Sequence, residues 1–477
     1  MFLKLKNKIL SKIKDPQDIY TTIYPLYLIC NILGLAPYVV KENPSGKREF
    51  YFGWRSILKS VLIVTSFLIV FGYAISRLDN PFQNSVDIKY KIRFFQEIFG
   101  NLLSGCEIVI GIFYASKIIE VFQNIDEVDN LFRGLAVWVC YKKFYVTVLI
   151  HIFGFCLIVV FTILHVLVIE SFLSGDFLYN TLLFSARYLP YLTNMLMEIQ
   201  YVNCLSIIRE RYKLLNQYLE ALVEDNNLHN ERAVKQSWVI EFLRNLMIRF
   251  SVEKDRLASG VVMGVVLGWM QKPVSTIPTT ITPEKDATKN MPKRIMSISD
   301  PVFIIDQVAT LHIKLTDTAH LVNDAFCVQQ LLRITVTFVS IVTALFTIAM
   351  NFAAPNKGDA ELDLYFTFWA FSNAIEVVSI VWITSETCEE ANTCPRILHK
   401  IRNHTTNTKL QDTIEIYSLQ MFHNKLYFTV CGLFPLDYSL LYTIVAGVTT
   451  YLVILIQFNI EIVQSSNSTV TNQSSTV

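Results

Sequence analysis

The chain has 477 residues, of which 52% are hydrophobic and 17% are charged, and its formal net charge at pH 7 is +1. This composition indicates a membrane protein, and the near-neutral charge argues against a role in nucleic-acid binding. The nine cysteines are scattered and do not form a paired extracellular framework.

Residues 1–53 predict a cytoplasmic N-terminal segment. The first fourteen residues carry five lysines, and no small-residue cleavage site follows an apolar core, so a cleavable signal peptide is not expected. The stretch 21–40 is nearly as apolar as a membrane span, but Pro25 and Pro37 interrupt it. We interpret this stretch as a half-buried or interfacial helix.

Seven later segments are long and apolar enough to cross the bilayer, which takes about 20 residues per helix. The predicted spans are 54–76, 98–119, 145–169, 180–204, 331–352, 364–385 and 437–460. The fold class is therefore predicted to be all-α, with spans 1–4 in residues 54–204, spans 5 and 6 in 331–385 and span 7 in 437–460.

The distribution of charge predicts the direction of these spans. The N-terminus is basic, whereas the connection 170–179 carries two acids and no basic residue, so the N-terminus is expected in the cytoplasm. An odd number of spans then places the tail 461–477 outside the cell, where Asn467 and Asn472 begin glycosylation acceptor sequences. A G-protein-coupled receptor has the opposite orientation.

Two soluble regions are predicted on the cytoplasmic side. Region 205–330 contains helical patterns at 205–224, 230–258 and 302–330, with a disordered Pro-, Thr- and Lys-rich insert at about 271–301. Region 386–436 is predicted to be helical as well. The triplet Glu210-Arg211-Tyr212 resembles a G-protein-receptor motif but follows the wrong span, and we interpret it as charge on a helix surface.

The sequence contains no motif of an enzyme, a cofactor site or a metal site. Cys388, Cys394 and His399 lie close together, but their spacing matches no zinc pattern and a fourth ligand is missing. The chain also lacks a Gly-rich phosphate loop, a nucleophile elbow and a metalloprotease helix. We therefore expect no catalytic activity, no cofactor and no bound metal.

Ionisable groups inside the spans are the best pointers to function, because each costs about 2.5–3.5 kcal/mol at mid-bilayer. They are Glu107, His151, His165, Arg187, Glu198 and Glu376. We expect the three glutamates to form buried structural pairs and the two histidines to be satisfied core residues. Arg187 shares a helix face with Tyr188 and Tyr191, and either donates to a ligand in an outer pocket, pairs with Glu107 or Glu376, or reaches the membrane surface.

The last span carries a polar stripe. Steps of three and four residues give Ser439, Thr443, Gly447, Thr450, Ile454, Gln457 and Glu461. A carboxamide such as Gln457 is costly in lipid, so this face is expected to meet protein, a wet cavity or, in an oligomer, a pore. In a pore, Glu461 would add a ring of negative charge at the outer mouth.

The same helix carries a recognisable motif. Thr450-Tyr451, five aliphatic residues and Gln457-Phe458 stand in the order that marks the last span of insect gustatory receptors. Cys431-Gly432-Leu433-Phe434 and Gly34-Leu35-Ala36-Pro37-Tyr38 resemble that family too. The resemblance is closest to the fructose-receptor branch, and related bitter- and warmth-responsive branches share much of it.

The resemblance implies a ligand-gated, non-selective cation channel in the plasma membrane of chemosensory neurons. It implies a homotetramer, or a hetero-oligomer with other gustatory receptors, surrounding one pore with Gln457 and Phe458 at the constriction. Trp369 resembles a tryptophan of the ligand pocket in the fructose-receptor branch, although an interfacial aromatic belt is the alternative. Phe366 and Asn373 lie near it in sequence, and Phe346 and Thr347 face the same cavity if the helices pack as in the family.

The sequence leaves other functions open. A small tastant, fructose first and another sugar second, is the expected ligand, with a bitter compound or warmth as alternatives. A metabotropic receptor coupled through the 205–330 loop is a different class. A transporter is disfavoured, because paired discontinuous helices are not found at matching positions of two halves.

Overall fold

A computed structural model describes the backbone of residues 16–43, 48–76, 88–172, 177–224, 301–353 and 359–474. Side chains are described for 16–43, 48–73, 76, 98–164, 188–223, 301–352 and 366–458. The insert predicted at about 271–301 and the helix predicted at 230–258 thus lie outside the described residues, apart from Pro301. His165, Arg187 and Glu461 belong to described helices, but their side chains lie outside the described set.

A small N-terminal unit precedes the first long helix. Helix α2 (Ile19–Ile32) contains Pro25, and strands β1 (Tyr38–Glu42) and β2 (Arg48–Phe52) form an antiparallel hairpin after it. The prediction of one helical stretch over 21–40 is therefore wrong beyond Ile32. Gly34 has a φ of +81°, which ends the helix in a turn that favours glycine.

The hairpin is fixed to the helices by aromatic packing. The ring of Phe50 lies 5.2 Å from that of Tyr27 in α2 and 5.1 Å from that of Phe122 in the long helix Ile88–Gly134. The hydroxyl of Tyr27 also donates to the carbonyl of Tyr38, at 2.9 Å. This unit closes one side of the molecule at the start of α3.

The rest of the molecule is built from long helices. They are α3 (Trp54–Ser76), α4 (Ile88–Gly134), α5 (Tyr141–Phe172), α6 (Phe177–Glu224), α8 (Pro301–Ala353), α9 (Asp359–His404) and α11 (Tyr438–Ser474). In the part of the chain that the structure describes, six of these are long and apolar enough to cross a membrane: α3, α4, α5, α8, α9 and α11. The fourth predicted span lies within α6.

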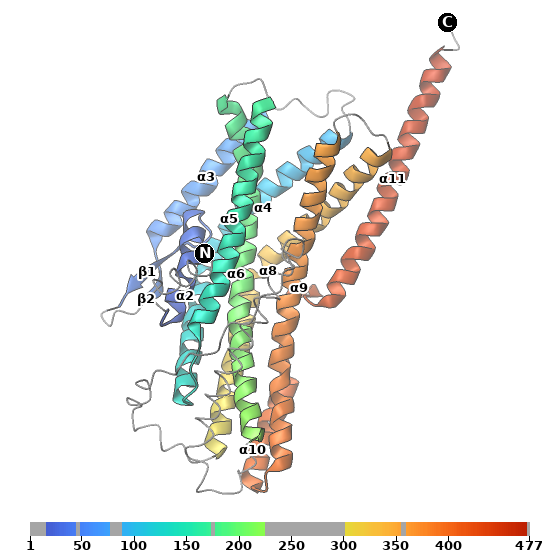
Figure 1. The fold of residues 1–477 in the computed structure, drawn as a ribbon. Coiled ribbons are helices and arrows are strands. Elements are labelled where there is room, and N and C mark those ends of the chain that lie inside the picture. Colours follow the sequence, from blue (N-terminus) through green and yellow to red (C-terminus); the bar gives the residue numbers. More distant parts are fainter. Residues whose placement is uncertain are drawn as a thin grey trace, which may run out of the picture.

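Several helices run far past the length of a span (Figure 1). α6, α8 and α9 continue without a break to the end of the molecule opposite the C-terminus, where α10 (Thr408–His423) packs against α8 and α9. The hydroxyls of Tyr212 and Thr316 share a hydrogen bond of 2.8 Å there, and His312 Nε2 lies 3.0 Å from the carbonyl of Ala391. A second short hairpin, β3 (Thr429–Val430) with β4 (Phe434–Pro435), precedes α11.

The interpretation of Glu210-Arg211-Tyr212 as surface charge is wrong for Arg211 and Tyr212, which are buried, whereas Glu210 is partly exposed. Arg211 is buried and makes two hydrogen bonds to the carboxylate of Asp129, at 3.0 and 3.1 Å. Burial would lower the pKa of Arg211, but the paired carboxylate outweighs burial and raises the pKa above its ordinary value. α6 is enclosed by other helices at this level, so its charges pair internally instead of facing water.

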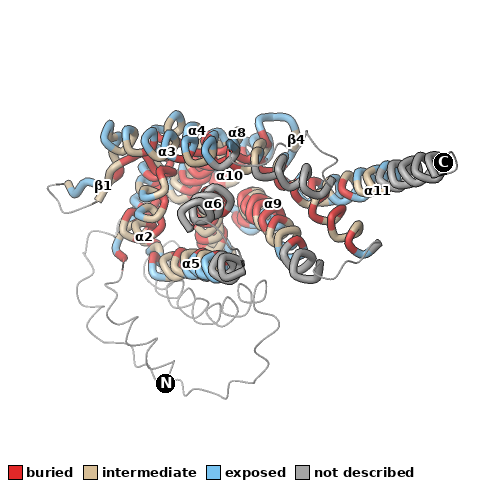
Figure 2. The backbone as a smooth tube through the Cα atoms, turned by 90° about the horizontal axis from the view of Figure 1, so that it is seen from above, coloured by how far each residue is buried: buried red, intermediate tan, exposed pale blue. Residues whose placement is uncertain are grey.

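Helix α11 stands apart from the other helices. It leaves the bundle at one edge and projects away from it in both views, in contact with α8 and α9 (Figures 1 and 2). α3 and the N-terminal unit lie at the opposite edge, as the view from above shows (Figure 2). The helix with the polar stripe is therefore largely uncovered by its own protomer, as α5 is.

Candidate functional site

A buried polar face runs along α8. Gln330, Arg333, Thr337 and Ser340 follow one another at steps of three and four residues and are all buried. Further along the same face, Thr347 and Asn351 are buried as well. This face points into the bundle formed by α4, α6, α8 and α9, because these are the helices against which α8 packs.

Arg333 is the centre of an electrostatic cluster on that face. Its guanidinium forms a direct ion pair with Glu376 of α9. Asn194 of α6 links the pair to α4 when its amide is oriented with the nitrogen toward Glu107 and the oxygen toward Arg333. In that orientation the nitrogen donates to the Glu107 carboxylate at 2.7 Å and the oxygen accepts from Arg333 at 3.3 Å. The described partner of Glu376 is therefore Arg333, which sequence reasoning did not name. The side chain of Arg187 lies outside the described set, so its pairing with Glu107 or Glu376 stays a prediction.

Glu198 belongs to the same layer. It interacts electrostatically with Glu376, Arg333 and Glu107, yet neither carboxylate oxygen has a hydrogen-bond partner among the described residues. Three carboxyl groups of the described part thus surround one guanidinium. The expectation of buried structural pairing is confirmed for Glu376, whereas Glu198 has an electrostatic neighbour but no hydrogen bond.

Sequence reasoning missed Arg333, although the signal was present. Arg333 stands two residues inside the predicted fifth span and resembles a boundary charge. Its steps of three and four to Gln330, Thr337 and Ser340 mark a polar face of a helix, as the stripe of the last span did.

His151 behaves as expected for a satisfied residue, with Nδ1 at 3.2 Å from Asn203 Oδ1.

The candidate ligand residues gather between α6 and α9. The rings of Tyr191 and Trp369 lie 4.7 Å apart, and the hydroxyl of Tyr191 lies 2.5 Å from that of Ser372. The amide of Asn373 donates to the carbonyl of Trp369 at 2.8 Å. Tyr188 is buried one turn away from Tyr191. Trp369 therefore packs against α6 and is half-buried.

The remaining candidates lie in the core. Phe346, Thr347 and Phe366 are buried, and the hydroxyl of Thr347 donates to the carbonyl of Thr343 in its own helix. Thr347 is thus satisfied locally by its own helix.

The polar stripe of α11 is mostly exposed in the protomer. Ser439, Thr443, Thr450, Ile454 and Gln457 are exposed, and 60% of Phe458 is accessible to solvent. Gly447 differs, because it faces α8. A Cβ at Gly447 would lie 3.1 Å from the ring of Phe338, so the glycine permits close packing. Tyr451 packs edge-on to the same ring, at 5.9 Å.

This arrangement defines a multi-pass helical membrane protein with a polar core and an uncovered C-terminal helix. The chain matches the 7tm chemosensory receptor family over residues 23–259 and 270–462. It belongs to this family, and it is a receptor and not an enzyme.

Among known proteins, the chain is similar to gustatory receptor 28a of Drosophila melanogaster, with 25% identity over 464 residues, or 94% of each chain. It is also similar to the gustatory receptor for bitter taste 66a of that organism, with 31% identity over 97 residues, 19% of this chain and 18% of the relative. The predicted resemblance to the fructose-receptor branch is not supported, because receptor 28a, which matches nearly the whole chain, is not of a sugar-receptor branch.

Two solved structures share the fold. The insect olfactory receptor OR5 from Machilis hrabei superimposes with a TM-score of 0.58 at 13% identity, covering 91% of this chain and 97% of that one. Its complex with eugenol gives 0.55 at 12% identity, with the same coverage. At this identity the likeness concerns the fold.

Proposed function

We propose that the chain is a gustatory receptor that acts as a ligand-gated, non-selective cation channel, built as a homotetramer around α11. The observation that carries the proposal is the exposed stripe of Thr450, Gln457 and Phe458 on a helix that its own protomer leaves uncovered. A membrane helix with such a face is stabilised when identical copies enclose it around water.

The proposed gate is formed by Phe458 and Gln457, with Glu461 at the outer mouth. A ring of four phenylalanines blocks ions by dewetting, and rotation that replaces the rings with carboxamides rewets the path. The carboxylates of Glu461 would favour cations.

The energy required is modest. Moving a gate from about 1% to about 99% open takes about 5.5 kcal/mol of differential binding. Shared over four pockets, this is roughly 1.4 kcal/mol each, or a tenfold preference for the open state. Weak binding of a small tastant is therefore sufficient for strong gating.

The proposed tastant site lies at Tyr191, Trp369 and Ser372, between α6 and α9. Two neighbouring rings, tilted by 41°, beside hydroxyl groups suit a sugar, which has apolar C–H faces and a rim of hydroxyls. The same rings suit an aromatic bitter compound, and the similarity to a bitter-taste receptor favours this second candidate. The two candidates are separated by applying a panel of sugars and bitter compounds to cells that express this chain in the plasma membrane and recording the evoked current.

Reconstitution tests the channel. The purified full-length chain is placed in planar bilayers without a G protein, and current is recorded while tastants are added. We expect ligand-evoked cation current. A response that requires an added G protein would instead support coupling through the 205–330 loop and would reject the channel.

Trp369→Ala is expected to reduce tastant sensitivity without changing unitary conductance. The aromatic ring contributes about 0.5–1.5 kcal/mol per site, so the half-maximal concentration should rise by about 2- to 12-fold. Dose–response curves and single-channel records measure both quantities. Trp382→Ala, a matched change on the same helix, should leave sensitivity unchanged. Equal loss of sensitivity and conductance in the Trp369 variant would contradict the assignment.

A further inference from the structure

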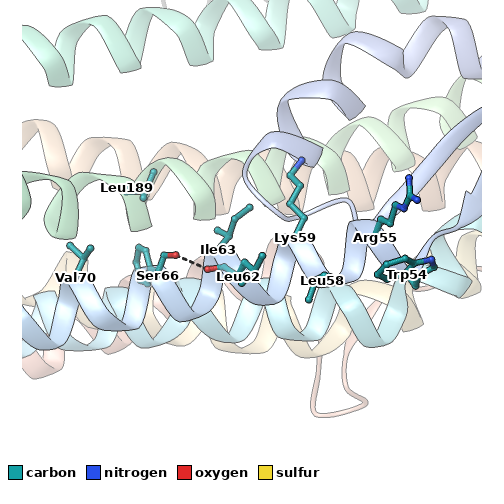
Figure 3. Close-up of a pocket in the computed structure, with 10 residues that line it drawn as sticks. Trp54, Arg55, Leu58, Lys59, Leu62, Ile63, Ser66, Val70 and Leu189 are labelled. Carbon is teal, nitrogen blue, oxygen red and sulfur yellow. Dashed lines mark hydrogen bonds between the residues drawn. The ribbon is translucent and has the colours of Figure 1, made fainter.

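A groove on the outside of the bundle is separate from both proposed sites. It has a volume of about 640 Å³ and runs along α3, with one residue of α6 at its far end (Figure 3). The wall is apolar over most of its length, and its members are Leu58, Leu62, Ile63, Phe67, Val70 and Leu189. The volume falls in the range of small-molecule sites.

The polar groups of the groove are concentrated at one end. Arg55 and Lys59 lie one helical turn apart on the first turns of α3, and the guanidinium of Arg55 lies 5.7 Å from the centre of the Trp54 ring. Lys59 donates to the side-chain oxygen of Asn31 at 2.7 Å, and an ammonium has two further donors. The hydroxyl of Ser66, midway along, already donates to the carbonyl of Leu62.

The position of the groove excludes a second copy of the chain as its occupant in the proposed assembly. α3 lies at the edge of the protomer opposite α11 (Figure 2), so the groove faces lipid when four copies meet at α11. α3 begins at Trp54, and tryptophan is enriched at membrane–water interfaces, so this end of the helix is expected at the interface. In the orientation that the charge distribution predicts, with the N-terminus inside, this end of α3 meets the cytoplasmic leaflet, which is rich in anionic lipid.

We propose that this groove binds an anionic glycerophospholipid of the cytoplasmic leaflet. The headgroup lies against Arg55 and Lys59, and one acyl chain follows the apolar wall to Val70 and Leu189. Leu189 stands between the candidate pocket residue Tyr188 and Pro190 of α6. The bound chain therefore ends against the helix that carries part of the proposed tastant site.

The test uses the purified full-length chain in mixed micelles with palmitoyl-oleoyl phosphatidylserine or palmitoyl-oleoyl phosphatidylcholine. Native mass spectrometry measures retained lipid, and thermal melting measures stabilisation. Each cation contributes about fivefold in affinity, equivalent to about 1 kcal/mol, so phosphatidylserine should bind about 25-fold more tightly than phosphatidylcholine. Equal retention of the two lipids would overturn the proposal.

Variants locate the site. Arg55→Gln changes an exposed residue and should reduce the phosphatidylserine preference about fivefold, whereas Ser66→Trp should fill the groove and reduce retention of both lipids. Lys409→Gln, which changes another exposed cation, on α10, is the matched control and should retain the full preference. An unchanged preference in Arg55→Gln, or an equal loss in Lys409→Gln, would assign the binding to diffuse surface charge. Because retention is measured without current, its outcome is independent of the proposed channel.

Discussion

Replacement of Arg333 by methionine is expected to prevent assembly of a stable receptor. The guanidinium forms the ion pair with Glu376 and also donates to Asn194, which is bound to Glu107. Loss of one partner of a buried pair costs about 3–5 kcal/mol, because the other charge remains buried without compensation. This cost is a large part of the stability of a typical protein. Surface expression and the melting temperature of the purified chain measure the effect.

Two further variants separate charge from volume. Glu376→Gln should be milder than Arg333→Met, because Arg333 keeps the carboxylates of Glu107 and Glu198 nearby. The double variant Arg333→Met/Glu376→Gln removes both charges of the pair and should recover part of the lost stability. Wild-type melting of Arg333→Met would show that the cluster is not an electrostatic support of the bundle.

Replacement of Phe458 by alanine is expected to increase the current in the absence of ligand about tenfold. In the proposed closed pore, the ring blocks ions by dewetting, and a tenfold shift in opening corresponds to about 1.4 kcal/mol. The folded protomer should tolerate the change, because the side chain is exposed and surface substitutions usually stay within about 0.5 kcal/mol. Whole-cell recording with a parallel assay of surface expression measures both effects.

The matched control is Phe153→Ala. Phe153 lies on α5 and is 65% exposed, against 60% for Phe458, so the two variants remove the same ring from similarly open positions. The α5 variant should leave current unaltered.

Gln457→Ala should alter conduction or basal leak at normal surface expression. Wild-type currents in both α11 variants would place the ion path elsewhere.

The long helices could be predicted because a membrane span has a strong one-dimensional signal. An apolar run of about 20 residues identifies a spanning helix without reference to any other part of the chain. The family motif at Thr450 and Gln457 is equally local. The hairpin of β1 and β2 was missed, although the Asn-Pro-Ser-Gly stretch between two aromatic, β-branched segments is a turn signal. The apolar character of 21–40 was read as one element instead.

The pairing of charges could not be predicted in the same way. Arg211 and Arg333 both stand near the ends of predicted spans, where a charged residue usually reaches water. Their environment depends on helices that continue past the membrane boundary and enclose them, which is a property of the assembled bundle. Spacing predicted that Tyr188 and Tyr191 share a face of α6. Trp369 and Ser372, which contact Tyr191, come from α9, and spacing within one helix does not predict such contacts.

The unbroken course of α8 has a mechanical consequence. A helix of 53 residues is about 80 Å long at 1.5 Å per residue, and a tilt of about 5° about its middle displaces each end by roughly 3.5 Å. α8 packs against α11 through Phe338 in its C-terminal half and also packs against α10, so a small rocking motion near Thr347 would reach the far end at full amplitude. Clamping α10 from the cytosol, for example with an antibody fragment, should then change how readily the receptor opens.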